Sequence, residues 1–167
     1  MGKTSFDYTL DFDNINFREH PEWYLTGVGE QGVLLVEPYK SEILPYWRFK
    51  TPEAAKVSAV KIYSLFVEYG KQKDFAGMDM ARKFLEMGYT RSRRYANHRS
   101  GKKYDGPVPA DKKGRSGAHG RKQLAEEPDR AKAESAEIFY SYWMKAKADN
   151  TYILLLKLHK EQLKNEL

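Results

Sequence analysis

The chain has 167 residues, 41% hydrophobic residues, a formal net charge of +6 at pH 7 and no cysteine. The lack of cysteine excludes disulfides and cysteine-ligated zinc or iron–sulfur sites, and the four histidines are too scattered for a metal motif, so we predict no metal or other cofactor. The apolar runs are too short for a signal peptide or a transmembrane span. We therefore expect a cytoplasmic protein, folded as a single domain over residues 1–167.

The first fifty residues are rich in aromatic and turn-forming residues but lack helical periodicity. Two β-favouring runs, Trp23 to Thr26 and Gly32 to Val36, are separated by Gly27 and Gly29, which suit a tight reversal of the chain. We predict a small β-hairpin or an irregular, aromatic-rich cap here. Most of its aromatic side chains are expected to pack onto a helical core.

Helical signals begin at Thr51, which can cap a helix that ends near Gly70 and carries an apolar stripe. Asp74 begins a second predicted helix, and Gly88 suits the residue that follows a helix end. Thr90 then caps a short third helix, so the predicted order is helix, short turn, basic helix. This order has a weak similarity to a helix-turn-helix motif, although most two-helix turns bind no DNA.

Residues 101–127 are rich in Gly, Lys and Arg and poor in apolar residues, and we predict that they form a mobile segment, here named the basic loop. A long helix is predicted from Pro128 through Ala148, and a last helix capped by Asp149 or Asn150. The predicted fold class is mainly α (α+β), with about five helices and the small N-terminal hairpin or irregular cap.

Positive charge is concentrated in residues 82–122. They hold 13 of the 29 Lys and Arg but only three acidic residues, a net charge of +10 against −4 for the rest of the chain. Such a field selects polyanions, and nucleic acid is the first candidate. The alternative is that the arginines are simply solvated, or that some of them pair with carboxylates such as Asp79 or Glu86 inside the fold.

The residue types in this block suit contact with both the backbone and the bases of nucleic acid. Arg matches phosphate oxygens and guanine edges, Asn can pair with adenine, and Tyr95 or Tyr104 could stack on an exposed base. On a helix, Arg93 and Asn97 would share one side. The predicted nucleic-acid-binding residues are Arg91, Arg93, Arg94, Asn97, His98, Arg99, Lys102, Lys103 and Tyr104.

Two other functions remain open from the sequence. A protein-binding accessory factor would dock through an aromatic surface, and exposure of Trp23, Trp47 or Trp143 would favour it. A phosphate-ester enzyme would need Glu37, Lys40 and His98 close together in the fold. The chain offers few recognisable catalytic spacings, so a function without catalysis is favoured.

Residues 29–42 (GEQGVLLVEPYKSE), 43–50, 77–84 (GMDMARKF) and 90–98 (TRSRRYANH) form distinctive segments. These segments resemble a family of bacterial and phage proteins that is defined only as a domain of unknown function. The resemblance implies one intact domain and a bacterial or phage origin, hence the cytoplasm of a bacterium or of an infected host cell. It implies no reaction, ligand or catalytic residue.

Overall fold

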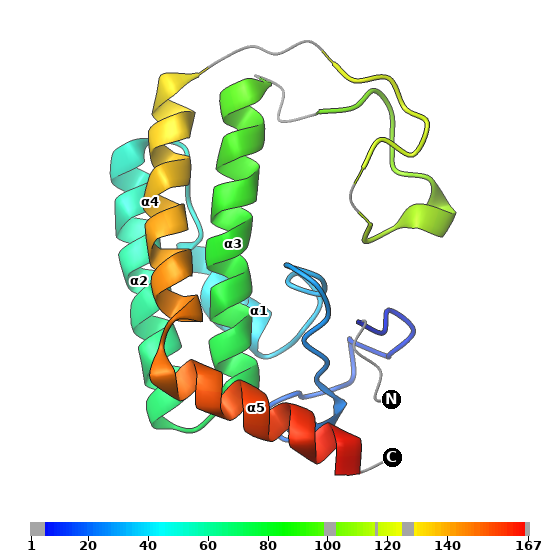
Figure 1. Ribbon diagram of the computed structural model, residues 1–167, viewed down its shortest axis with the longest axis vertical. Coiled ribbons are helices and arrows are strands. Elements are labelled where there is room, and N and C mark those ends of the chain that lie inside the picture. The colour runs from blue at the N-terminus through cyan, green and yellow to red at the C-terminus, as the bar shows by residue number, and fades with distance from the viewer. Residues whose placement is uncertain (1–5, 99–102, 116, 125–128, 166–167) are drawn as a thin grey trace.

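The protein is described by a computed structural model that covers residues 6–98, 103–115, 117–124 and 129–165. Three long helices, α2 (Pro52–Lys71), α3 (Phe75–Asn97) and α4 (Arg130–Lys147), lie side by side, and α5 (Asn150–Asn165) crosses one end of them (Figure 1). The prediction of a mainly helical fold is therefore confirmed. The α-helices of the described residues are α1 (Tyr39–Ile43), α2 (Pro52–Lys71), α3 (Phe75–Asn97), α4 (Arg130–Lys147) and α5 (Asn150–Asn165).

Local capping signals place most helix starts correctly. The hydroxyl of Thr51 accepts a hydrogen bond from the amide of Ala54 at 3.1 Å, and α2 begins at the next residue. Asp149 accepts from the amide of Tyr152 at 2.9 Å and begins α5 in the same way. A side-chain oxygen at the N-cap satisfies an amide that has no partner inside the helix, so these starts are readable from sequence.

The predicted break at Gly88 is wrong. α3 runs without interruption from Phe75 to Asn97, so the separate basic helix and the similarity to a helix-turn-helix motif are wrong as well. Gly88 lies where α3 packs against α4, and a Cβ atom there would be 2.3 Å from Cδ1 of Phe139. The glycine thus permits close packing of two helices and does not end one. Two predicted helices are thus the single helix α3, and α1 was not predicted. The prediction and the described residues therefore both contain five helices, although not the same five.

The predicted hairpin is also absent from the described residues. Pro21–Trp23 form a short 3-10 helix, and residues 28–35 form successive turns, with amides of Val33 and Leu35 donating to the carbonyls of Glu30 and Gly32 at 3.2 and 3.0 Å. Gly32 has φ +80°, and a Cβ on it would lie 2.1 Å from the ring of Phe6. Positive φ and close approach explain this glycine, so the irregular alternative is the one the structure contains.

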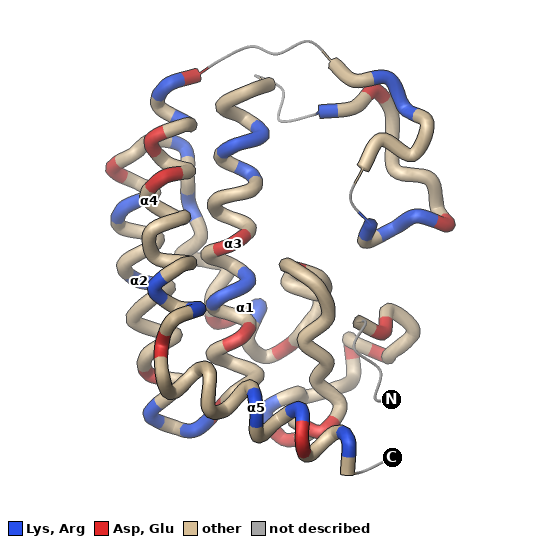
Figure 2. Tube along the Cα trace, viewed as in Figure 1, with Lys and Arg blue, Asp and Glu red and all other residues tan. Residues whose placement is uncertain are grey.

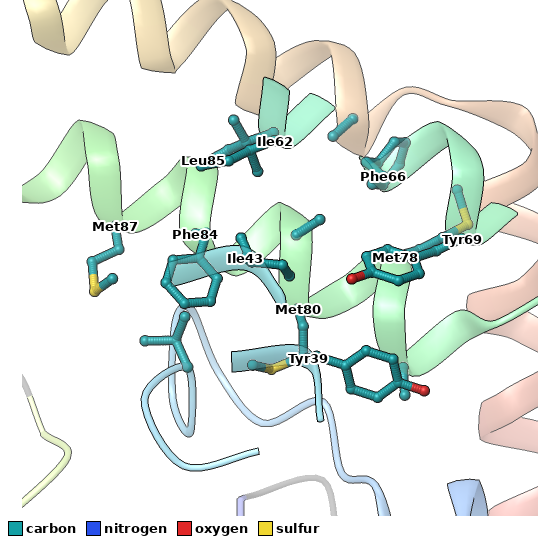
Figure 3. Close-up of a cluster of buried hydrophobic side chains, with 14 of the residues drawn as sticks. Tyr39, Ile43, Ile62, Phe66, Tyr69, Met78, Met80, Phe84, Leu85 and Met87 are labelled. Carbon is teal, nitrogen blue, oxygen red and sulfur yellow. The ribbon is translucent and has the colours of Figure 1, made fainter. Parts of the chain in front are cut away.

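The core is one hydrophobic cluster between α1, α2 and α3, extended by α4 and α5. Figure 3 shows how side chains from three helices meet there. Of the aromatic side chains in residues 6–50, here named the N-terminal segment, Phe17, Tyr24 and Tyr39 are buried as expected, whereas Trp23 and Tyr46 are exposed. The labelled members are Tyr39, Ile43, Ile62, Phe66, Tyr69, Met78, Met80, Phe84, Leu85 and Met87.

A buried polar cluster joins the N-terminal segment to α3 and α5. Asp79, which is 0% exposed, accepts hydrogen bonds from the hydroxyls of Tyr24 and Tyr152, the latter at 2.5 Å, and from Nη2 of Arg82 at 2.7 Å. Lys83 is also 0% exposed, and its Nζ lies 3.8 Å from Asp79. The carboxylate is thus surrounded by two cations and two hydroxyls, which together compensate its loss of water.

The same cations hold the turns of the N-terminal segment. Nζ of Lys83 donates to the carbonyl of Gln31 at 2.6 Å, and Nη1 of Arg82 donates to the carbonyl of Gly29 at 2.7 Å. Arg82 also pairs with Glu86 at 3.1 Å. The expectation that some arginines of the basic block pair inside the fold is therefore met by Arg82. Both cations belong to the scaffold.

Lys83 should give the stability of the protein a distinct pH dependence. Burial lowers the pKa of Lys83 to about 8 from 10.5, and Arg82 acts in the same direction while Asp79 opposes it. Between these two values the unfolded chain holds a proton that the folded chain has lost, so stability rises with pH. In the unmodified protein the free energy of unfolding should rise by up to about 1.4 kcal/mol per pH unit in this range. Lys83→Met should remove this rise.

Urea unfolding between about pH 8 and pH 9.5, below the range of free tyrosine, measures this slope. Lys160→Met, at an exposed position of α5, is the matched control and should keep the slope of the unmodified protein. Equal slopes for Lys83→Met and the unmodified protein would contradict the assignment.

Candidate nucleic-acid interface

The last turns of α3 present arginine to solvent. Ser92 and Ala96 are buried, whereas Arg94 is exposed and Arg91 and Arg93 are partly exposed. Small residues at a spacing of four let this side of the helix pack onto the bundle, and the arginines then occupy the opposite side. Cations near the C-terminus of a helix are also stabilised by the helix dipole. The sequence therefore positions a positive surface at one end of the bundle.

The end of α3 is tied to the start of α4. The amide of His98 donates to the carbonyl of Arg94 at 2.7 Å, and the amide of Asp129 donates to the carbonyl of Ala96 at 2.7 Å. These bonds satisfy carbonyls that lack a partner at a helix end. Because both helix ends are held, the arginines stand on a rigid element.

A pocket of about 380 Å³ lies between the C-terminal half of α3 and the basic loop. We name it the α3 pocket. It brings together five of the nine predicted binding residues, and three further side chains complete it. The predicted residues are Arg93, Arg94, Asn97, His98 and Lys103, and the others are Tyr89, Thr90 and Gln123.

The described part of the basic loop, residues 103–115 and 117–124, closes on itself (Figure 1). It contributes Lys103 and Gln123 to the lining of the α3 pocket. Tyr104 and Gln123 form an isolated antiparallel bridge, with the amide of Asp105 donating to the carbonyl of Lys122 at 2.7 Å and that of Leu124 donating to Lys103 at 2.8 Å. These bonds bring the two ends of the loop together. Lys103 and Gln123 thereby reach one wall of the pocket although they are twenty residues apart in sequence.

Tyr104 lies beside the pocket but does not line it. The guanidinium of Arg121 lies 4.9 Å and Nζ of Lys103 lies 5.5 Å from the centre of the Tyr104 ring. Arg121 also donates to three loop carbonyls, those of Ala118, Gly106 and Gly117, at 2.9 to 3.1 Å. Cations therefore cover Tyr104, and Arg121 serves chiefly to hold the loop.

The arginines of the site repel one another, and Glu30 compensates only part of this repulsion. Loss of water, followed by the positive charge of Arg91, lowers the pKa of Arg94, whereas Glu30 acts in the opposite direction. Burial raises the pKa of Glu30, and its carboxylate accepts a hydrogen bond from Thr90 at 2.8 Å. Among the described residues no ion pair involves Arg91, Arg93 or Arg94. An incoming anion would relieve the repulsion between these cations.

The remaining predicted residues have different positions. Arg91 lies on α3 outside the pocket, and Arg99 and Lys102 lie outside the described residues. Tyr95 packs against Phe49, with ring centres 5.7 Å apart, so the prediction that it could stack on a base is not supported by its packing.

Sequence reasoning missed Tyr89 and Gln123, and it interpreted Thr90 only as a helix cap. Tyr89 lies four residues before Arg93 and eight before Asn97, a stripe that one uninterrupted helix would have revealed. The false break at Gly88 hid it. Contacts with α4 hold the Tyr89 ring, which lies 5.2 Å from the ring of Tyr140 and 5.7 Å from that of Trp143. Gln123 had no sequence signal, because its place depends on how the basic loop closes.

The three residues of the enzyme hypothesis are not brought together. The Glu37 carboxylate accepts from the amide of Ser41 at 2.8 Å and so stabilises the start of α1. The neighbouring Tyr39 donates to Asp74 at 2.7 Å, at the first turn of α3, whereas His98 follows the last turn. The length of α3 is roughly 35 Å. In the part of the chain that is described, no three His, Asp or Glu side chains are arranged to hold a metal ion.

The three tryptophans differ in exposure. Trp23 is 47% exposed and stacks on His20 with ring centres 4.7 Å apart. Trp47 and Trp143 are partly buried, and each indole N–H is inaccessible to solvent. Of the three side chains that would favour a protein-docking surface, one is therefore available.

No helix within the described ranges has both the length and the apolar character needed to cross a membrane. No curated protein and no solved structure matches the chain. A family profile matches residues 7–162, which is most of the chain and includes the turns of the N-terminal segment, the bundle and the α3 pocket. The protein therefore belongs to the family described as Domain of unknown function (DUF4385).

Proposed function

We propose that the protein binds nucleic acid through the surface around the α3 pocket. The observation that carries the proposal is the convergence of Arg93 and Arg94 with Lys103 on one pocket, with no described carboxylate in an ion pair with either arginine. Figure 2 shows Lys and Arg along the upper half of α3 and on the basic loop beside it. Phosphate oxygens are the ligands that such a cluster favours.

The cations of α3 within residues 82–122 form two groups, and the two groups have different roles in this proposal. Arg82 and Lys83 hold the turns of the N-terminal segment and are buried. Arg91, Arg93 and Arg94 follow them on the same helix but lie nearer its end and reach solvent. Phosphate contact by the second group would release counterions from the nucleic acid, which makes affinity fall steeply with salt.

Replacing Arg93 and Arg94 together by Ala is expected to weaken binding and to reduce the slope of log affinity against log salt by about 2, since each arginine neutralises one phosphate. Fluorescence anisotropy with labelled single- and double-stranded DNA and RNA at stepped salt measures both quantities. The double variant Lys157→Ala/Lys160→Ala removes two exposed cations from α5 and should leave both unchanged. If the Arg93→Ala/Arg94→Ala variant binds with the same affinity as the unmodified protein, the proposal is refuted.

A second candidate function is docking onto a protein partner. It is supported by apolar side chains that remain exposed on α5, namely Ile153 (50%), Leu154 (55%) and Leu158 (50%), and by Trp23 at the N-terminal segment. Absence of nucleic-acid binding even at low salt would favour this candidate, with the cationic surface then contacting an acidic protein.

A further inference from the structure

We infer that the α3 pocket receives one unstacked base with its phosphate, and that the ligand is therefore a single-stranded nucleic acid. The inference rests on the proposed function and names the substrate class of the same site. It follows from the shape of the pocket, from the position of its side chains and from the elements that flank α3.

The flanking elements argue against entry of α3 into a duplex groove. A helix with its side chains is about 10–12 Å wide, which already fills a major groove of about 12 Å. Here the exposed stripe of α3 has the basic loop on one side, through Lys103 and Gln123, and α4 on the other, through the contacts of Tyr89. Both neighbours would collide with the duplex backbone. The cations of α3 thus line the wall of a pocket and do not stand on a protruding helix.

The size of the pocket suits a nucleotide. Its volume of about 380 Å³ lies within the usual range for small-molecule sites. Bases of a duplex are stacked and cannot enter such a pocket, whereas an unpaired base can turn out of its strand. A single strand also follows a cationic surface without a fixed helical geometry.

The side chains of the pocket supply the contacts that a nucleotide requires. Tyr89 offers an aromatic surface whose orientation is set by Tyr140 and Trp143 of α4, so little rotamer freedom is lost on stacking. The amides of Asn97 and Gln123 come from opposite walls, and each has both a donor and an acceptor for a base edge. The nearby guanidinium groups of Arg93 and Arg94 would hold the phosphate.

The experiment measures the affinity of three ligands of equal length at the same salt concentration. They are a single-stranded DNA, the same strand with abasic sites, and a duplex. Abasic strands keep every phosphate but lack bases, so they separate base entry from charge. We expect the base-bearing strand to bind about tenfold more tightly than either of the others. Tyr89→Leu and Gln123→Ala should each reduce this preference, and their thermal unfolding is measured alongside.

Matched controls are Tyr46→Leu and Gln162→Ala, which remove an exposed ring and an exposed amide far from the pocket in sequence and should keep the preference. Equal binding of all three ligands, weakened by the Arg93/Arg94 double variant, would overturn the inference and leave the proposed function intact. Duplex binding tighter than single-strand binding would also overturn it. Failure of all three ligands, and of an RNA strand of the same length, to bind at low salt would refute the proposed function itself.

Discussion

Asp79→Asn is expected to lower the free energy of unfolding by about 3–5 kcal/mol, because it removes the carboxylate between two buried cations and leaves only Glu86 paired with Arg82. Arg82 and Lys83 both approach this side chain, at 2.7 and 3.8 Å, and their side chains are only 8% and 0% exposed. The hydroxyls of Tyr24 and Tyr152 would also lose a charged acceptor. Urea unfolding at neutral pH measures the change.

Asp13→Asn is the matched control, since Asp13 is exposed, and it should change stability by less than about 0.5 kcal/mol. A double variant, Asp79→Asn/Lys83→Met, also removes Lys83, whose ion pair is with Asp79, whereas Arg82 keeps Glu86. The double variant should therefore lose less free energy of unfolding than the sum of the losses of the two single variants. A loss below about 1 kcal/mol for Asp79→Asn would show that the carboxylate does not hold the cluster.

Gly88→Ala is expected to destabilise the protein by about 1–3 kcal/mol. Helix propensity alone would give the opposite sign, because Ala in a helix interior is more favourable than Gly by about 0.8–1.0 kcal/mol. The added Cβ would lie 2.3 Å from Cδ1 of Phe139, so α3 and α4 must move apart or the ring must shift. Chemical denaturation measures the sign as well as the size of the effect.

A double-mutant cycle with Phe139→Leu identifies the cause of this loss. If the clash is responsible, Gly88→Ala costs less in the Phe139→Leu background than in the unmodified protein. If Gly88 instead ended a helix, the smaller side chain would bring no such recovery. Ser141→Ala, on the exposed side of α4, is the propensity control and should be neutral or slightly stabilising. A stabilising Gly88→Ala would contradict the packing described for α3 and α4.

The two errors at the level of secondary structure have one physical cause. Gly88 was interpreted as a helix end and Gly32 as the first residue of a β-strand, both from the residues beside them in sequence. In the structure Phe139 and Phe6, distant in sequence, approach these positions so closely that no Cβ fits. A glycine required by a neighbour has the same sequence signal as one required by a turn.

The residues of the candidate site also differ in whether local sequence or tertiary contacts determine their position. Arg93, Arg94, Asn97 and His98 were predictable because they are close in sequence and one helix brings them to one surface. Gln123 was not predictable, since hydrogen bonds between the two ends of the basic loop place it. The charge count also treated all cations of the block alike, although Arg82 and Lys83 are buried in the scaffold.

The sequence by itself determined the helical class, the capped starts of α2 and α5, the concentration of positive charge and the resemblance to the family. These properties depend on residues within a few positions of one another, where propensity, capping and charge act. Only the tertiary structure decided that α3 is continuous, which cations are buried and that a pocket forms beside the basic loop. Each of these depends on packing between distant segments, and a residue's local pattern does not specify the partner it will contact.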